Sequence, residues 1–116
     1  MRAVLTLAHG DRSQLRLVHD HPDPQPATGQ VVVEVGACAV NFHDIFTRRG
    51  MPGIRIPLPV IVGSDMAGVI VAVADDVAGW AVGDRVLIDP VFTVDGRQHL
   101  IGETVDGGRA ERIAVD

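Results

Sequence analysis

Lysine is absent from this chain of 116 residues, so all ten basic residues are arginine. Fifteen acidic residues outweigh them and give a formal net charge of −5 at pH 7. The arginines form no basic cluster of the kind that binds the phosphates of nucleic acids or lipids. The composition therefore predicts no nucleic-acid partner and no attachment to an acidic membrane.

Cysteine occurs only once, at Cys38, which excludes an internal disulfide and any metal site made from several thiolates of one copy. Long apolar runs are also lacking, because none approaches the roughly 20 residues that span a bilayer. The N-terminal segment MRAVLTLAHGDRSQ becomes polar too early for a signal peptide. We expect a cytoplasmic protein.

Apolar residues make up 47% of the chain, which suits one packed domain at this length. Glycines and prolines separate short segments in which apolar residues alternate, as is typical of strands. Between Val31 and Val40 one face is wholly apolar and is expected in the core. The other strands are expected at residues 1–7, 15–19, 66–74, 84–89 and 109–115.

A change of period predicts one short helix after residue 40. Asn41 can cap its N-terminus, Asp44 suits the same cap, and Gly50 can end the helix in a left-handed conformation. Residues 51–65 contain three prolines and are expected to be irregular. About six strands and one helix predict a mainly β fold, a partly open barrel.

Dinucleotide-binding motifs are absent as well: neither G-x-G-x-x-G nor a P-loop sequence occurs. Three stretches nevertheless form an ordered set: VGACAVNFHDIFTRRG (35–50), LPVIVGSDMAGVIVAVADDVAGWAVGDRV (58–86) and LIGETVDGGRAERIAV (100–115). In this order the chain resembles the N-terminal, GroES-like domain of the medium-chain dehydrogenase/reductase superfamily, which includes zinc alcohol dehydrogenases and quinone oxidoreductases. The resemblance implies a GroES-like barrel over residues 1–116, with the NAD(P)H-binding Rossmann domain absent from this chain.

Two positions depart from the zinc-dependent members of that superfamily. Those members carry Cys where this chain has Asn41, and Gly-His-Glu where it has Gly63-Ser64-Asp65. An amide and a hydroxyl are poor zinc donors, and a catalytic site normally has three good ones. The four cysteines of the structural zinc lobe are missing too. We therefore expect no metal.

The segment Asn41-Phe42-His43-Asp44 resembles that of zinc-independent quinone or enone reductases, in which it lies beside the nicotinamide. The resemblance implies NADP or NAD as cofactor, bound mainly by a C-terminal Rossmann domain, and a quinone or α,β-unsaturated carbonyl as substrate. Asn41, Phe42 and Asp44 would border the cofactor. The catalytic candidates are Asn41, Asp44, Ser64 and Asp65. The chain alone should bind NADPH weakly, show no turnover and be able to form a homo-oligomer.

Two other functions stay open. A zinc-dependent alcohol dehydrogenase domain would recruit His43 and Asp65 or Glu103 as ligands, and a free-standing GroES-like binding module would lack chemistry altogether. The same residues also have purely structural interpretations. Asn41 and Asp44 fit helix capping, with Asp44 and Arg48 as an exposed i,i+4 ion pair.

Single side chains beside these motifs have their own expectations. Phe42 is expected in the core rather than as a stacking surface, and Trp80 is expected to pack against the barrel. His43 is expected to face solvent, the alternative being a proton relay. Cys38 is expected to be an inert, buried thiol.

Overall fold

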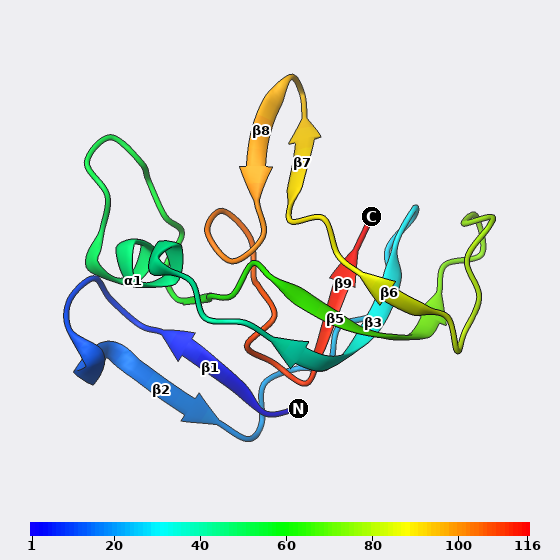
Figure 1. Cartoon of the computed structure of the whole chain (residues 1–116), viewed down its shortest axis with the longest axis horizontal. Coiled ribbons are helices and arrows are strands. Elements are labelled where there is room, and N and C mark those ends of the chain that lie inside the picture. The colour runs from blue at the N-terminus through cyan, green and yellow to red at the C-terminus, as the bar shows by residue number, and fades with distance from the viewer.

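The computed structural model describes all residues 1–116 and consists mainly of antiparallel β-sheet with a single α-helix (Figure 1). The predicted mainly β class and the one short helix are confirmed. In chain order the elements are β1 (Ala3–Thr6), the 3-10 turn η1 (Arg12–Gln14), β2 (Leu15–Val18), β3 (Val31–Cys38), α1 (Phe42–Arg49), β4 (Val60–Ile61), β5 (Met66–Val73), β6 (Arg85–Leu87), β7 (Val91–Val94), β8 (Arg97–Leu100) and β9 (Arg112–Val115).

Three sheets make up the fold. The strand orders are β2-β1-β4, β6-β5-β3-β9 and β7-β8. Main-chain contacts join the first two sheets, because Ala3 forms a bridge with Ala110 and the amide of Val4 donates to the carbonyl oxygen of Arg109 (2.9 Å). The four-stranded sheet ends at β6 and β9, which are not paired with each other, so the barrel stays open on that side.

The core lies on the inner face of the four-stranded sheet. Apolar side chains from four elements or loops meet there, among them Val33 and Ile70, which are almost completely buried. A second, smaller cluster is formed by apolar side chains of the segment 51–62 itself. The buried members of the main cluster are Val31, Val33, Met66, Ile70, Ile101 and Ile113.

Strand β3 departs from the simple alternation expected of it. Its pairing with β5 shifts register between Val35 and Ala37. One extra residue of β3 lies in this bulge, so the side chains after it point to the opposite faces of the sheet from those that strict alternation would give. Ala37 is consequently exposed and Cys38 packs against the core cluster, the reverse of the predicted faces. The predicted apolar face is buried only at its beginning, at Val31 and Val33.

The hairpin β7–β8 was not predicted from the sequence. It occupies the stretch in which zinc-dependent relatives were expected to have their cysteine lobe. Asp95 (φ 50°) and Gly96 (φ 72°) form its two-residue turn, and Asp-Gly is a strong signal for a turn of this type. The structure contains no helix with both the length and the apolar character needed to cross a bilayer.

Candidate functional site

Helix α1 begins with half of the predicted cap, because Asp44 bonds back to Asn41 but the side chain of Asn41 makes no cap hydrogen bond. The carboxylate of Asp44 accepts a hydrogen bond from the backbone amide of Asn41 (2.9 Å), and the amide of Asp44 donates to the carbonyl oxygen of Asn41 (3.1 Å). Asn41 has the extended backbone typical of an N-cap (φ −113°, ψ 156°). Its own side chain is therefore left free for another contact.

The partner of Asp44 differs from the expected one. Nη2 of Arg109 donates to Oδ2 of Asp44 at 2.7 Å, so the predicted exposed pair with Arg48 is wrong. Asp44 is only 4% exposed, and Arg48 is itself buried, with its guanidinium donating to the carbonyl oxygen of Gly10. A buried carboxylate is stable only with strong partners, and Arg109 reaches it, whereas the guanidinium of Arg48 is bonded to Gly10.

Asn41 and Asp65, two of the predicted catalytic residues, come together in the structure. The side-chain Nδ2 of Asn41 donates to Oδ2 of Asp65 at 2.7 Å, across 24 positions of sequence. The contact fixes the plane of the Asn41 amide and uses one of its two N–H groups. The second N–H group remains available to a ligand.

Ser64 takes a different position from its neighbour Asp65. Its side chain is buried, and its hydroxyl donates to the backbone carbonyl oxygen of Ile101 at 2.8 Å. Asp65, by contrast, is exposed. Of the four predicted catalytic residues, Asn41 and Asp65 reach the surface, while Asp44 and Ser64 are buried.

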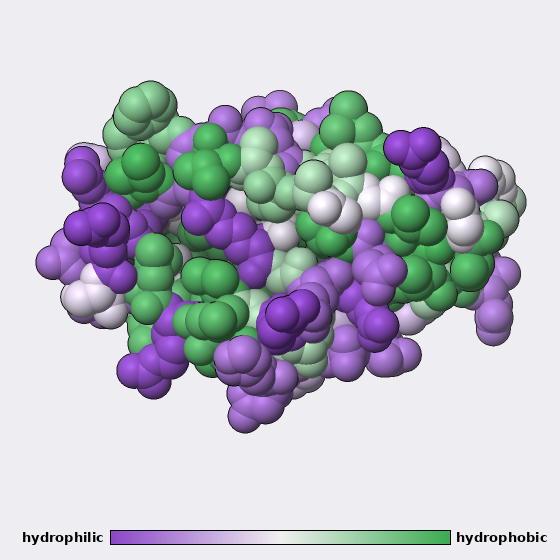
Figure 2. Space-filling model, turned by 60° about the horizontal axis from the view of Figure 1, so that its bottom comes forward, coloured by the Kyte–Doolittle hydropathy of each residue, from purple (hydrophilic) through white to green (hydrophobic).

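The position of Phe42 contradicts the prediction that it lies in the core. Its side chain is 78% exposed instead of packing in the core, and its ring lies 6.4 Å from that of Phe46, centroid to centroid. As the first residue of α1 it points away from the sheets, because the buried face of the helix carries polar Asp44, Thr47 and Arg48. Val40 is also exposed. On the face shown in Figure 2, such hydrophobic residues gather in patches separated by hydrophilic ones.

His43 and Glu103, which the sequence analysis brought together only as possible zinc ligands, form a direct contact. Nε2 of His43 lies 2.6 Å from Oε2 of Glu103, and the two side chains are 32% and 11% exposed. The expectation that His43 faces solvent is therefore only partly right. Glu103 follows Gly102, where a Cβ atom would lie 2.8 Å from the backbone nitrogen of Gly63, so the pair depends on a long-range contact that the sequence does not signal. Close backbone approach of this kind brings the loop with Glu103 over the site.

Cys38 lies near the same ion pairs and is only partly buried. Burial raises the pKa of its thiol above the ordinary value, with nearby Asp44 and Asp65 adding to the increase and Arg109 opposing it. A thiol that resists ionisation is a poor nucleophile. The geometry agrees with the expected inert cysteine.

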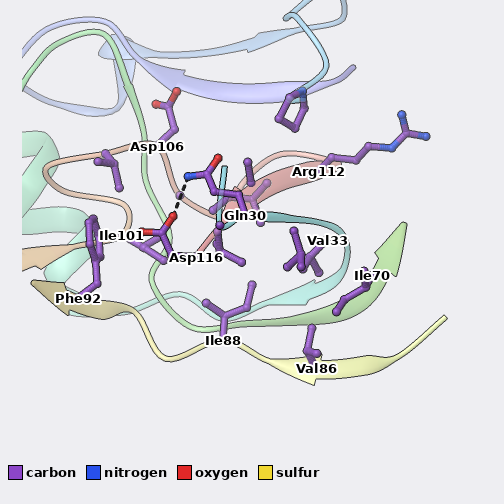
Figure 3. A pocket seen from close by; sticks show the side chains of 18 of the residues that line it. Gln30, Val33, Ile70, Val86, Ile88, Phe92, Ile101, Asp106, Arg112 and Asp116 are labelled. Atoms are coloured by element: carbon purple, nitrogen blue, oxygen red, sulfur yellow. Dashed lines mark hydrogen bonds between the residues drawn. The ribbon is translucent and has the colours of Figure 1, made fainter. Parts of the chain in front are cut away.

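A large cavity lies elsewhere, at the open side of the barrel between β6 and β9 (Figure 3). Its volume is about 920 Å³. Core side chains such as Val33 and Ile88 line it, and a hydrogen bond from Gln30 to Asp116 (2.9 Å) lies beside it. Trp80 lines the cavity but is more than half exposed, so the expected packing against the barrel is wrong. None of the predicted site residues lines this cavity.

Comparison with known proteins places this geometry in a family. Residues 27–116 match the alcohol dehydrogenase GroES-like domain. The chain belongs to this family. The resemblance to the medium-chain dehydrogenase/reductase superfamily is thereby confirmed, and so is the GroES-like fold.

Relatives of this GroES-like domain include oxidoreductases. It is 38% identical over 117 residues to the human quinone oxidoreductase, matching all of the chain and 32% of that protein. It is 33% identical over 99 residues to the acryloyl-coenzyme A reductase of Metallosphaera sedula, matching 85% of the chain and 28% of that protein. It superimposes on a crystal structure of an NAD-dependent alcohol dehydrogenase with a TM-score of 0.91 and 33% identity, covering 99% of the chain and 37% of the other. The chain thus spans about a third of the length of these relatives.

Zinc does not fit the residues that this GroES-like domain offers. At the two positions where zinc-dependent relatives were expected to have Cys and His, the amide of Asn41 donates to Asp65 and the hydroxyl of Ser64 donates to Ile101. An amide and a neutral hydroxyl are weak zinc donors, so these two positions offer zinc no strong ligand. No three His, Cys, Asp or Glu side chains lie close enough together to hold a metal ion.

A nicotinamide ring fits the exposed part of the site. The ring of Phe42 offers an apolar surface, and Asn41 beside it offers the amide N–H that Asp65 leaves free. A nicotinamide presents a flat ring with a carboxamide, which needs both kinds of contact. Asp44 contacts Asn41 and Arg109 and would act on a cofactor through Asn41.

Proposed function

We propose that this GroES-like domain supplies the substrate side of an NAD(P)H-dependent oxidoreductase of the quinone or enone reductase type, which transfers hydride without zinc. The observation that carries the proposal is the Asn41–Asp65 contact beside the exposed Phe42. It provides an oriented hydrogen-bond donor where zinc-dependent members would hold a metal. The similarity to a quinone oxidoreductase and to a reductase of an α,β-unsaturated thioester supports this substrate class.

The amide of Asn41 would stabilise the charge that grows on the substrate oxygen. Its free N–H donates to that oxygen, while Asp65 holds the other N–H and prevents the amide from rotating. A fixed donor of this kind stabilises a developing oxyanion more than solvent does, because it needs no reorganisation during the reaction. When bound, the reduced nicotinamide supplies the hydride.

The exposed apolar side chains would exclude water from the reacting atoms. Val40 and Phe42 lie on either side of Asn41 in sequence, and both are exposed in the domain alone. We propose that a Rossmann domain following this domain covers them and holds most of the cofactor. The acidic charge and the half-buried Cys38 suit a cytoplasmic location, which is part of the same proposal.

Two measurements test this function. The domain alone should bind NADPH more weakly than micromolar in a fluorescence titration and should not oxidise it. Joined to a Rossmann domain, it should oxidise NADPH with a quinone or an enone and contain no stoichiometric zinc after purification without chelators. Tight NADPH binding by the domain alone, or activity that chelators abolish, would contradict the proposal.

Substitution of Asn41 tests the donor itself. Asn41→Leu should lower kcat of the joined protein by about 100-fold, the usual effect of removing one oxyanion donor. Gln98→Leu changes an exposed amide on the β7–β8 hairpin and should leave kcat unchanged. Equal activity of the two variants would exclude Asn41 as the donor.

A further inference from the structure

His43 and Glu103 form a pair that is closer and more buried than an ordinary surface ion pair. Glu103 is nearly buried, and its Oε2 lies 2.6 Å from Nε2 of His43. Exposed ion pairs contribute little to stability and tolerate variable geometry. A nearly buried carboxylate instead depends on its partner, so the position of the His43 ring is fixed by Glu103.

The loop that carries Glu103 is held rigidly against the site. The backbone amide of Glu103 donates to the carbonyl oxygen of Leu100 (3.1 Å), and Ser64 donates to the carbonyl oxygen of Ile101 (2.8 Å). Gly102 packs so closely on Gly63 that a side chain at position 102 would overlap its backbone. Glu103 therefore cannot move away without disturbing the segment that also carries Asp65.

The two nitrogens of the His43 ring have different surroundings. Nε2 is buried and lies 2.6 Å from Oε2 of Glu103, a close contact that does not have the geometry of a hydrogen bond. Nδ1 has no hydrogen-bond partner within the chain and, unlike Nε2, is not buried. A carboxylate on one ring nitrogen orients the imidazole and leaves the other nitrogen for proton transfer. A carboxylate beside one ring nitrogen and an unburied second nitrogen are compatible with proton transfer from this ring.

We infer that His43 is the catalytic proton donor of this domain and that Glu103 is the residue that positions it. The inference rests on the proposed function. His43 lies two residues after Asn41 in the first turn of α1, so the donor to the oxygen and the donor of the proton project from one helix end.

The proton step balances on the substrate. Addition of hydride to the β-carbon of an enone leaves an electron pair shared between the α-carbon and the oxygen. That pair takes the proton from Nδ1 of His43, forming a new C–H or O–H bond, while the N–H bonding pair stays on the ring. The imidazole is left neutral with its remaining proton on Nε2, facing Glu103, and recovers a proton from water.

A spectroscopic experiment tests the pair on the domain alone. In ¹⁵N-edited spectra of the imidazole rings, the neutral form of His43 should carry its proton on Nε2, and Glu103→Gln should change this to a mixture of tautomers. Glu34→Gln, at an exposed position of β3, should leave the His43 signals unchanged. A His43 ring that is unaffected by Glu103→Gln would overturn the assigned pair.

Kinetics of the domain joined to a Rossmann domain test the proton transfer. His43→Gly should lower kcat with an enone by roughly 100-fold, the low end of general acid catalysis, and added imidazole should restore part of it. His19→Gln, at an exposed position just after β2, should not change kcat. If the unsubstituted protein reduces the enone and His43→Gly is equally active, the inference fails and the proposed function stands. If the unsubstituted protein reduces no enone or quinone, the proposed function fails and the inference falls with it.

Discussion

Cys38 offers an unusually direct test of a single side chain, because the chain has neither lysine nor tyrosine. Above neutral pH, only this thiol and the N-terminal amine are expected to titrate below the range of arginine. Burial raises the pKa of Cys38 in the folded state above its ordinary 9.0. The unfolded chain therefore releases this proton first, so the free energy of unfolding should fall as pH rises through and above 9.0.

Urea unfolding followed by circular dichroism over this pH range measures the effect. Cys38→Ala provides the control, since it removes the thiol and should remove the thiol's part of the pH dependence. A pH dependence of equal size in Cys38→Ala would show that another group is responsible. The same raised pKa predicts that thiol reagents label Cys38 more slowly in the folded protein than in urea.

The contacts at the site show which residues the sequence can and cannot assign. The cap formed by Asn41 and Asp44 is local, three residues apart, and was predicted from that spacing. The contacts of Asn41 with Asp65 and of Asp44 with Arg109 span 24 and 65 positions, so no periodicity encodes them. The family resemblance placed Asn41 and Asp65 in one site but gave no sign of Arg109.

At the level of elements, Gly68 in β5 allows the close pairing of β3 and β5. A Cβ atom at this position would overlap the carbonyl oxygen of Glu34 and lie 2.7 Å from Cγ1 of Val33, a core residue. Gly68→Ala should therefore destabilise the fold by about 2 kcal/mol, as overpacking usually does. Thermal or urea unfolding measures the loss.

Gly36 of β3 is the matched control for Gly68. It lies at the register shift opposite the same part of β5, and an added Cβ would lie 3.7 Å from the carbonyl oxygen of Ala67, an ordinary contact. Gly36→Ala should leave stability within about 0.5 kcal/mol of the original. Equal losses for the two variants would show that the close approach at Gly68 is not what limits the side chain there.

Arg109 fastens α1 to the segment that leads into β9. Its contact with the buried Asp44 holds the carboxylate that caps the helix at Asn41. Arg109→Met would leave that charge buried without its partner and should cost about 3 kcal/mol of unfolding free energy. Arg2→Met breaks an exposed pair with Glu111 and should produce no resolvable change. A loss no larger for Arg109→Met would contradict the assigned role.

The elements themselves were predictable to the extent that their signals are local. The strands now labelled β1, β2, β3, β5, β6 and β9 and the helix were predicted because their apolar patterns and turn residues lie within short windows. The hairpin β7–β8 was missed although Asp95-Gly96 signals its turn, because its strands are mostly exposed and lack a clear alternation. The β3 bulge depends on pairing with β5 and has no signal in β3 alone.

For the whole molecule, the two open regions of the fold have different characters. The cavity between β6 and β9 is lined by core residues and lies apart from the site. The exposed patch at the start of α1 consists of large apolar side chains that continue from the site: Val40, Phe42 and Phe46. Contiguous apolar surface on a small domain usually marks an interface, and the proposed function assigns this patch to the Rossmann domain.

When nothing else covers this patch, it should make the isolated domain associate with itself. The chain should elute from a size-exclusion column as a monomer when dilute and shift toward larger species as its concentration rises. Burying the two phenylalanine rings would stabilise the contact by roughly 25 cal/mol for each Å² of apolar surface removed from water. Phe42→Ser combined with Phe46→Ser should keep it monomeric at every concentration. Leu87→Ser removes an equally exposed side chain on the edge strand β6 and should not prevent association. If the Leu87 variant alone becomes monomeric, the copies associate along the sheet edge, and the α1 patch is not their interface.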